Sequence, residues 1–286
     1  MMDTALTSLL QEISTNAFQQ RCASANKLSL EDVARRIDIY TGEIATGLAL
    51  LDGLELHGKR ILEVGAGLGL LSIHLKQQGF DVTALEPGSG GFDFNATTGK
   101  LIRDQAGVDD LPVWDCPAED LSPDTHGQFD VIFSSNVLEH IPKMDIALKA
   151  MLSVLKPDGI MVHTCPNYRI PYEPHYGLPL VPFAPRATAG LRPSLKEDDL
   201  WLSLNFVTHG DIVRFCRSND ASVSFDRELL YQAFRRLDGE AVFRDRQPAY
   251  LRAALSILKR LKLLNLLKFV GPSWSTPMRF RITHTS

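Results

Sequence analysis

The stretch Ile61-Leu62-Glu63-Val64-Gly65-Ala66-Gly67-Leu68-Gly69 joins an apolar run directly to a glycine-rich turn. A helical segment, Leu70–Gln78, and a second apolar segment, Phe80–Leu85, follow it, and the second segment ends on Glu86. Strand, glycine turn, helix, strand and terminal acid together form one nucleotide-binding half of a doubly wound α/β sheet. The glycines allow the backbone to approach a ligand, and the acid can accept both hydroxyls of a ribose.

The spacing of the glycines separates two classes of cofactor. A dinucleotide fingerprint needs glycines in the pattern Gly-x-Gly-x-x-Gly, whereas Leu70 occupies the last of these positions. Glu63, just before the turn, is poorly suited to a doubly charged pyrophosphate but well suited to a ligand with an ammonium group. The stretch therefore favours S-adenosylmethionine (SAM), and a glycine turn in another Rossmann-like protein is the alternative.

Further motifs follow in order along the chain. EVGAGLG (63–69), the strand-ending Glu86, AEDL (118–121), FDVIFSSNVLEHIPK (129–143) and LKPDG (155–159) resemble those of class I SAM-dependent methyltransferases. They look most like the small-molecule branch with ubiquinone-biosynthesis-type enzymes, the methyltransferase type 11 and 23 group. Each motif alone is weak, but five in order are a strong signal. The resemblance covers about residues 59–165.

The resemblance implies a Rossmann-like α/β fold, doubly wound, with a mainly parallel seven-stranded sheet. Residues 1–56 are expected to form an N-terminal helical cap from two helices, 6–20 and 29–51. Residues 57–286 are then the class I methyltransferase domain. Its final strand, 278–283, is expected to insert antiparallel to its neighbours, as it does in the family.

The resemblance also implies a set of cofactor-binding residues. These are Glu63, Gly65, Gly67, Gly69, Glu86, Pro87, Ala118, Glu119 and Asn136. Glu63 would lie near the amino group of SAM, Glu86 would accept the ribose hydroxyls, and Asn136 would contact the methionine portion through its backbone. Pro87, Ala118 and Glu119 would bound the adenine. Asp115-Cys116-Pro117 stands where the family more often has Gly-Asp, which puts the adenine amine contact in doubt.

The reactive group of SAM is a sulfonium, so much of the rate can come from placing the acceptor in line with it. A general base is needed only if the acceptor holds its proton. His140 and His175 are the catalytic candidates, and a structural role for His140 and a solvated loop position for His175 are the alternatives. No metal is predicted, because the spacing of the nearby carboxylates demands no magnesium site.

The segment 166–207 is interrupted by seven prolines and contains several aromatic residues. Long segments of this kind are typically lids, binding loops or disordered, and the aromatic content argues against disorder. It follows a strand, and therefore leaves the carboxyl edge of the sheet, where ligands bind. We predict a substrate-side lid with Tyr168, Tyr172 and Tyr176 as substrate-binding residues; an arm that holds a dimer partner is the alternative.

Residues 248–270 are predicted to form a basic amphipathic helix. After Asp245 the chain contains no acidic side chain, whereas eight lysines and arginines follow it. Basic amphipathic helices of this kind can lie on anionic membranes. Packing against the sheet or a second subunit, with the lysine head groups reaching solvent, is the alternative.

Composition limits the compartment and the partners. The chain has 286 residues and a formal net charge of −4, which argues against a broad nucleic-acid footprint; a local basic patch is the alternative, and no nucleic-acid partner is expected. The four cysteines are scattered without metal-ligand spacing, and the sequence shows no signal-peptide pattern and no membrane-spanning segment. We therefore predict a cytoplasmic protein, and peripheral contact with the inner face of a membrane is the second prediction. The predicted function is SAM-dependent methylation of a small molecule or a lipid- or saccharide-linked intermediate. A protein or RNA methyltransferase and a non-catalytic SAM-binding or partner-binding domain are the alternatives.

Overall fold

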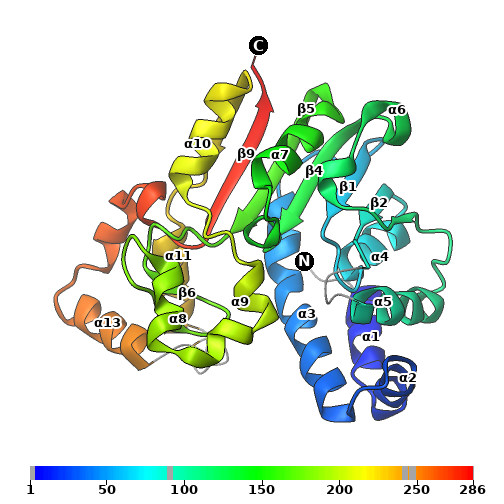
Figure 1. Cartoon of the computed structure of the whole chain (residues 1–286), viewed down its shortest axis with the longest axis horizontal. Helices are drawn as coiled ribbons and strands as arrows, with labels where there is room; N and C mark the ends of the chain where they lie inside the picture. The colour runs from blue at the N-terminus through cyan, green and yellow to red at the C-terminus, as the bar shows by residue number, and fades with distance from the viewer. Residues whose placement is uncertain (1–3, 89–92, 240–243, 245–248, 286) are drawn as a thin grey trace. The chain divides into compact units, whose positions relative to one another are not determined.

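A computed structural model describes residues 4–88, 93–239, 244 and 249–285 of the chain (Figure 1). The chain divides into two compact units. The first unit comprises the residues up to Val137 together with Lys143–His163, and the second comprises Leu138–Pro142 and Thr164–Thr285. The predicted helical cap, residues 1–56, belongs to the first unit.

The first unit begins with three helices, α1 (Thr4–Ile13), α2 (Asn16–Asn26) and α3 (Leu30–Leu51). The prediction of a single helix over residues 6–20 is wrong, because a new helix starts after Thr15. The backbone of Thr15 is extended and its hydroxyl accepts a hydrogen bond from the Phe18 amide, which caps α2. The predicted helix over residues 29–51 is confirmed, with Ser29 as its cap.

Helix α3 contributes to the core through one face. Val33, Ile37 and Ile44 are buried on it, at the spacing of three to four residues that the sequence predicts. They belong to a cluster that also contains Ile61 and Val131 from the sheet. The helix is therefore held to the first unit by apolar packing.

The sheet has seven strands in the order β3-β2-β1-β4-β5-β9-β8. Its strands are β1 (Arg60–Val64), β2 (Asp81–Leu85), β3 (Val113–Trp114), β4 (Phe129–Ser135), β5 (Leu155–Cys165), β8 (Ala221–Phe225) and β9 (Met278–His284). β1 runs parallel to β2 and β4, and β2 runs parallel to β3, whereas β8 and β9 are antiparallel. The predicted Rossmann-like, mainly parallel seven-stranded fold is confirmed.

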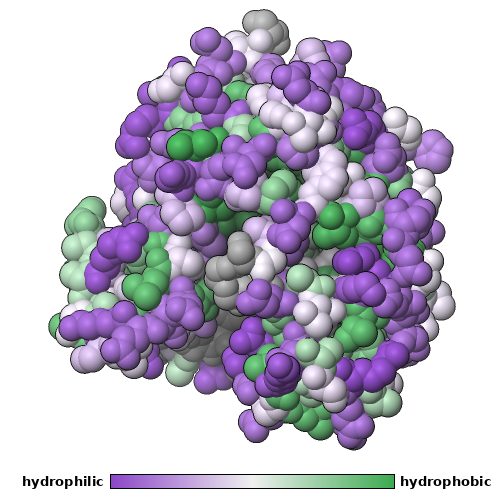
Figure 2. Space-filling model, turned by 45° about the vertical axis from the view of Figure 1, so that its right-hand side comes forward, coloured by the Kyte–Doolittle hydropathy of each residue, from purple (hydrophilic) through white to green (hydrophobic). Residues whose placement is uncertain are grey.

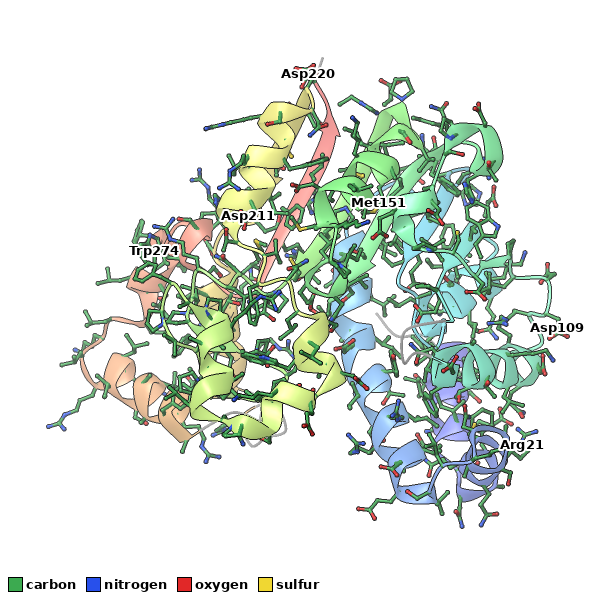
Figure 3. All side chains as sticks on the ribbon, viewed as in Figure 1. Arg21, Asp109, Met151, Asp211, Asp220 and Trp274 are labelled. Carbon is green, nitrogen blue, oxygen red and sulfur yellow. The ribbon has the colours of Figure 1, made fainter. Side chains whose placement is uncertain are left out.

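Helices and short turns connect the strands of the first unit. They are α4 (Leu70–Gln77), α5 (Asp93–Ala106), η1 (Ala118–Asp120), α6 (Pro123–His126) and α7 (Met144–Ser153). The motif LKPDG (155–159) opens β5, since α7 already ends at Ser153. Met151, labelled in Figure 3, is one of the side chains that α7 buries.

The second unit contains η2 (Leu138–His140) and the predicted lid segment, which folds into short elements. These are β6 (Tyr172–Glu173), β7 (Leu178–Pro179), η3 (Pro185–Ala187), α8 (Thr188–Leu191), η4 (Pro193–Glu197) and α9 (Asp199–Ser203). β6 and β7 form a two-stranded antiparallel sheet. Leu195, Trp201 and Leu204 are buried, so the segment has an apolar core of its own.

The rest of the second unit contains α10 (His209–Ser218), α11 (Leu229–Gly239), α13 (Ala249–Arg260), η5 (Leu264–Phe269) and η6 (Pro272–Trp274). Asp211, labelled in Figure 3, completes a capping box with Thr208 at the start of α10. The predicted continuous helix over residues 248–270 is wrong, and Pro248 lies outside the described residues. Lys262 has a φ of 58°, and the Leu263 amide bonds back to the Leu258 carbonyl, a pattern that ends a helix.

Among the residues that the structure describes, no helix combines the length and the apolar character needed to cross a bilayer. On the face of the molecule seen in Figure 2, hydrophobic residues (green) are interspersed with hydrophilic ones. Several large apolar side chains of the second unit are nevertheless exposed. Phe183, Leu191, Ile257, Leu261, Leu266, Phe269 and Trp274 are among them.

Candidate functional site

The order of the strands in the sheet reverses between β1 and β4. From β1 the sheet continues to β2 on one side, and from β4 it continues to β5 on the other. Ligands of open α/β sheets bind at such a switch point, beyond the carboxyl ends of the strands. Gly65 follows β1 there, and Val137 follows β4. A β-carbon placed on Gly65 would lie 2.4 Å from Val137 Cγ2, so the two connections touch and leave room only for glycine.

Glu86 is the centre of the polar groups at this edge. One of its carboxylate oxygens accepts the Gly67 amide at 2.8 Å, and the other accepts the Asn95 side-chain amide at 2.7 Å. Burial raises the pKa of Glu86 above its ordinary value, against the lowering effect of these two hydrogen bonds. Each carboxylate oxygen can accept more than one hydrogen bond, so Glu86 can still accept ribose hydroxyls.

Tyr40 from α3 lies over the glycine turn. A β-carbon on Gly67 would lie 2.4 Å from Tyr40 Cε1, and the Gly67 φ is +57°. The Tyr40 hydroxyl donates to Asn95 Oδ1 at 2.8 Å. From the sequence we expect glycine here because a ligand approaches the backbone. In the structure the Tyr40 ring already fills the space that a side chain at Gly67 would need.

Glu63 is buried and holds the start of α4. Its Oε2 accepts the Ser72 amide at 3.0 Å and also the Ser72 hydroxyl. Burial raises the pKa of Glu63 to about 8, and the charge of Glu86 adds to the increase. The predicted contact of Glu63 with the amino group of SAM therefore stays a prediction, and in this structure its carboxyl group is engaged by the helix.

Asp115 orders the loop next to one of the predicted adenine-side residues, Pro87. Its carboxylate accepts the Gly88 amide at 2.8 Å, which anchors the backbone immediately after Pro87. Ala118, at the start of η1, is buried, and Glu119 is half-buried. Asp115 thus orders this loop, although it departs from the usual family pattern.

Asn136 follows β4 in a left-handed conformation, with φ of 55°. Its side-chain amide donates to Glu43 of α3 at 3.3 Å. The predicted contact of the Asn136 backbone with the methionine portion of SAM stays a prediction. The hydrogen bonds of Asn95, Glu43 and Asp115 were not predicted from the sequence. Asn95 lies nine residues from Glu86, Asp115 lies 27 residues from Gly88, and Glu43 lies 93 residues from Asn136.

The second unit contains a separate cluster of three side chains that could hold a metal ion, Glu139, His140 and His175. One potential ligand atom of each lies within 4.8 Å of the others. The two imidazole rings meet edge to face, with centroids 5.2 Å apart. The structure thus brings together the two predicted catalytic histidines and places Glu139 beside them. The sequence predicts no metal site, and Glu139 was not considered there as a ligand. We call these three residues the histidine cluster.

Hydrogen bonds fix the ring of His140. Its Nδ1 lies 2.8 Å from Ser203 Oγ, and the Ser203 hydroxyl donates to the Leu200 carbonyl at 2.8 Å. Because that hydroxyl proton is already committed, Ser203 accepts from His140 Nδ1–H. Nε2 then carries the lone pair, and it lies 4.0 Å from Glu139 Oε1.

His175 is oriented by Glu173 in the same way. Its Nδ1 lies 2.6 Å from Glu173 Oε1, and a carboxylate only accepts, so the proton is on Nδ1; in the neutral ring the lone pair is then on Nε2. Glu173 is fully buried and also accepts the Tyr168 hydroxyl at 3.1 Å and the Tyr176 amide at 2.8 Å. Three donors therefore hold this carboxylate in place.

The three tyrosines predicted to bind substrate all belong to this unit. The Tyr168 hydroxyl is committed to Glu173, and the Tyr176 hydroxyl is committed to Asp198. Tyr172 is half-buried and meets Tyr250 edge to face, and burial raises its pKa to about 12. Their substrate contacts stay a prediction; the structure uses two of the hydroxyls to order the lid segment.

Burial lowers the pKa of His140 to about 3, and the neighbouring His175 adds to the effect. The ring is therefore neutral at physiological pH. A general base works best with a pKa near the operating pH, so this environment makes His140 a weak base. The same neutral imidazole is the form in which histidine binds metals.

Comparison with known proteins bears on both units. A family described as "Methyltransferase domain" matches residues 34–214. An uncharacterized protein of Mycobacterium tuberculosis is 33% identical over 236 residues, which cover 79% of each chain. The ubiquinone biosynthesis O-methyltransferase of Acinetobacter baumannii is 31% identical over 104 residues, 36% of this chain and 42% of that enzyme.

Among solved structures, a geranyl diphosphate C-methyltransferase from Streptomyces coelicolor matches with a TM-score of 0.51 and 12% identity. The match covers 85% of this chain and 79% of that enzyme. At this identity the likeness concerns the fold alone.

Proposed function

The chain belongs to the class I SAM-dependent methyltransferases, and on that premise we propose that it methylates a small, lipid-linked acceptor at the surface of an anionic membrane. Bound SAM supplies the methyl group on a sulfonium, which is a good leaving group. The protein supplies the placement of the two reactants and the exclusion of water.

The residues at the carboxyl ends of β1, β2 and β4 suit SAM. Glu86 has acceptor capacity for two ribose hydroxyls, and Asn95 holds its carboxylate in place. The turn that contains Gly65 and Gly67 brings backbone close to the ligand without side chains. We assign the adenine side to Pro87, Ala118 and Glu119, next to the loop that Asp115 anchors.

The observation that carries the membrane part of the proposal is the composition of the segment from α13 to η6. Ile257 and Leu261 are each 58% exposed, and Phe269 is 82% exposed. These side chains lie among exposed basic residues, and no acidic residue follows Asp245. Exposed apolar side chains combined with positive charge favour a surface of anionic lipid.

The structure also identifies which basic side chains are available to lipid. Lys259 forms an ion pair with Asp238 at 2.7 Å, and Lys268 lies over the Tyr231 ring at 4.7 Å. Arg252, Arg260 and Lys262 are exposed and carry the positive charge outward. An acceptor embedded in the same lipid surface is the class of substrate that this segment favours.

The test is co-sedimentation with vesicles of phosphatidylcholine and phosphatidylglycerol at low salt. Replacing Arg252, Arg260 and Lys262 with glutamine removes about 1 kcal/mol per charge, so binding should weaken by roughly a hundredfold. Binding of the wild type should also fall with added salt. A wild-type protein that stays in the supernatant at low salt rules out the membrane contact.

The control carries the same change in net charge at other exposed basic positions. It replaces Lys143, Lys149 and Arg217 with glutamine. Vesicle binding of this control should match the wild type, since none of the three lies in the α13 to η6 segment. Formation of S-adenosylhomocysteine from SAM in the presence of a lipid extract, but not of its water-soluble fraction, would identify the acceptor class.

A further inference from the structure

We infer that the histidine cluster is a binding site for a divalent transition-metal ion, with Glu139, His140 and His175 as its ligands. All three residues belong to the second unit, so the inference depends on the geometry of that unit alone. Their potential ligand atoms lie within 4.8 Å of one another. They come from η2 and from the connection between β6 and β7, two segments that are distant in the sequence.

The hydrogen bonds around the cluster prepare both rings for an ion. Ser203 holds the proton of His140 on Nδ1, and Glu173 holds the proton of His175 on Nδ1. In the neutral form of each ring, Nε2 therefore carries the lone pair that a metal needs. An outer carboxylate or hydroxyl on the second ring nitrogen is the usual arrangement around metal-binding histidines, because it fixes the tautomer and increases the basicity of the ligand.

The ligand types indicate the class of ion. Two imidazoles and one carboxylate suit Zn²⁺, Mn²⁺ or Fe²⁺, whereas Mg²⁺ and Ca²⁺ prefer a set made of oxygen alone. Bond lengths of about 2.0–2.2 Å bring tetrahedral ligand atoms to roughly 3.4 Å from one another. The ligand atoms, which lie within 4.8 Å of one another, therefore have to move closer by up to about 1.4 Å to share one ion.

Three protein ligands leave at least one coordination position open, as in catalytic rather than structural zinc sites. A water molecule or an oxygen of a bound ligand would take this position.

Metal binding is tested on the full chain without SAM or acceptor. After dialysis against a chelator, titration with Zn²⁺ by calorimetry, checked by elemental analysis, should show one equivalent bound. Titration with Co²⁺ should produce the visible absorption bands of cobalt that is bound by nitrogen and oxygen ligands. His175→Ala should weaken Zn²⁺ binding at least tenfold, and Glu173→Gln, which acts on the orientation of His175, should weaken it about 10- to 100-fold.

His57→Ala is the matched control, because His57 belongs to the first unit, which contributes no residue to the cluster. It should bind Zn²⁺ like the wild type. Calorimetry with SAM on His175→Ala, expected to match the wild type, shows that the fold is intact. Wild-type protein without stoichiometric Zn²⁺ binding, or His175→Ala that binds as tightly as wild type, overturns the inference and leaves the proposed methyl transfer untouched.

Discussion

Glu86→Gln is the substitution that most directly tests the cofactor site. The Glu86 carboxylate accepts Gly67 N–H at 2.8 Å and Asn95 Nδ2–H at 2.7 Å, and ribose hydroxyls would add to these donors. Glutamine keeps the shape but has one acceptor oxygen and no charge. Hydrogen bonds to a charged acceptor contribute about 1.5–3 kcal/mol, so the Kd for SAM should rise about ten- to hundredfold.

The assay is isothermal titration calorimetry with SAM at about pH 8. A pH above neutral is chosen because burial raises the pKa of Glu86, and the ionised carboxylate is the form that accepts the ribose hydroxyls. Asp81→Asn is the control, since Asp81 is exposed at the opposite end of the same strand β2. Its Kd should equal that of the wild type. An unchanged Kd in Glu86→Gln, in a protein that unfolds at a normal temperature, would refute the assignment of the ribose site.

Three further predictions concern stability, measured by urea unfolding. The pKa of Glu63 is raised from 4.5 to about 8 in the folded protein, so its contribution is fully present below about pH 4.5 and is lost as pH rises through 8. The wild type should lose free energy of unfolding, on the order of 4 kcal/mol, across this window, and Glu63→Gln should show a flatter profile. Gly67→Ala should cost about 1–2 kcal/mol for its left-handed backbone and more for the contact with Tyr40, and this extra cost should shrink in a Tyr40→Ala background. Thr208→Ala removes the side-chain cap of the capping box with Asp211 and should cost about 1 kcal/mol, and an unchanged free energy of unfolding in this variant would show that the Thr208 hydroxyl contributes nothing.

The parts of the fold that the sequence predicts well are those with a local cause. The apolar run that ends at Val64, the glycine turn and the strand that ends before Glu86 follow from periodicity and from glycine conformation. The capped helix that starts after Thr208 follows from its hydroxyl and from Asp211 three residues later. In each case the residues that decide the structure are neighbours in the chain.

The two helix breaks that the sequence did not predict each depend on a single residue that is compatible with more than one local structure. Thr15 is compatible with a helix interior or with a cap, and the cap wins because its hydroxyl bonds to the Phe18 amide. Lys262 ends the C-terminal helix in a left-handed conformation that glycine usually adopts. Helical periodicity gives no warning of either break.

The polar connections of the candidate site could not be predicted, because they join residues that are far apart in sequence. Asn95 bonds to Glu86 and to Tyr40, which lies 55 residues away. Nothing around Asn95 in the sequence distinguishes it from an ordinary helical asparagine. Only the fold shows that it links α3, α5 and the end of β2.

Hydrogen bonds to a buried carboxylate order the lid segment in spite of its prolines. Glu173 is fully buried, and it accepts hydrogen bonds from Tyr168, His175 and Tyr176. A buried carboxylate is tolerated only when such donors surround it, so the residues that order the segment are the ones that orient His175. Deleting residues 172–178 would remove this carboxylate and would leave the buried Tyr168 hydroxyl without its acceptor, which costs about 1–3 kcal/mol. Loss of activity after that deletion would therefore report on folding as much as on chemistry, and only single substitutions at the edge of the cluster separate the two.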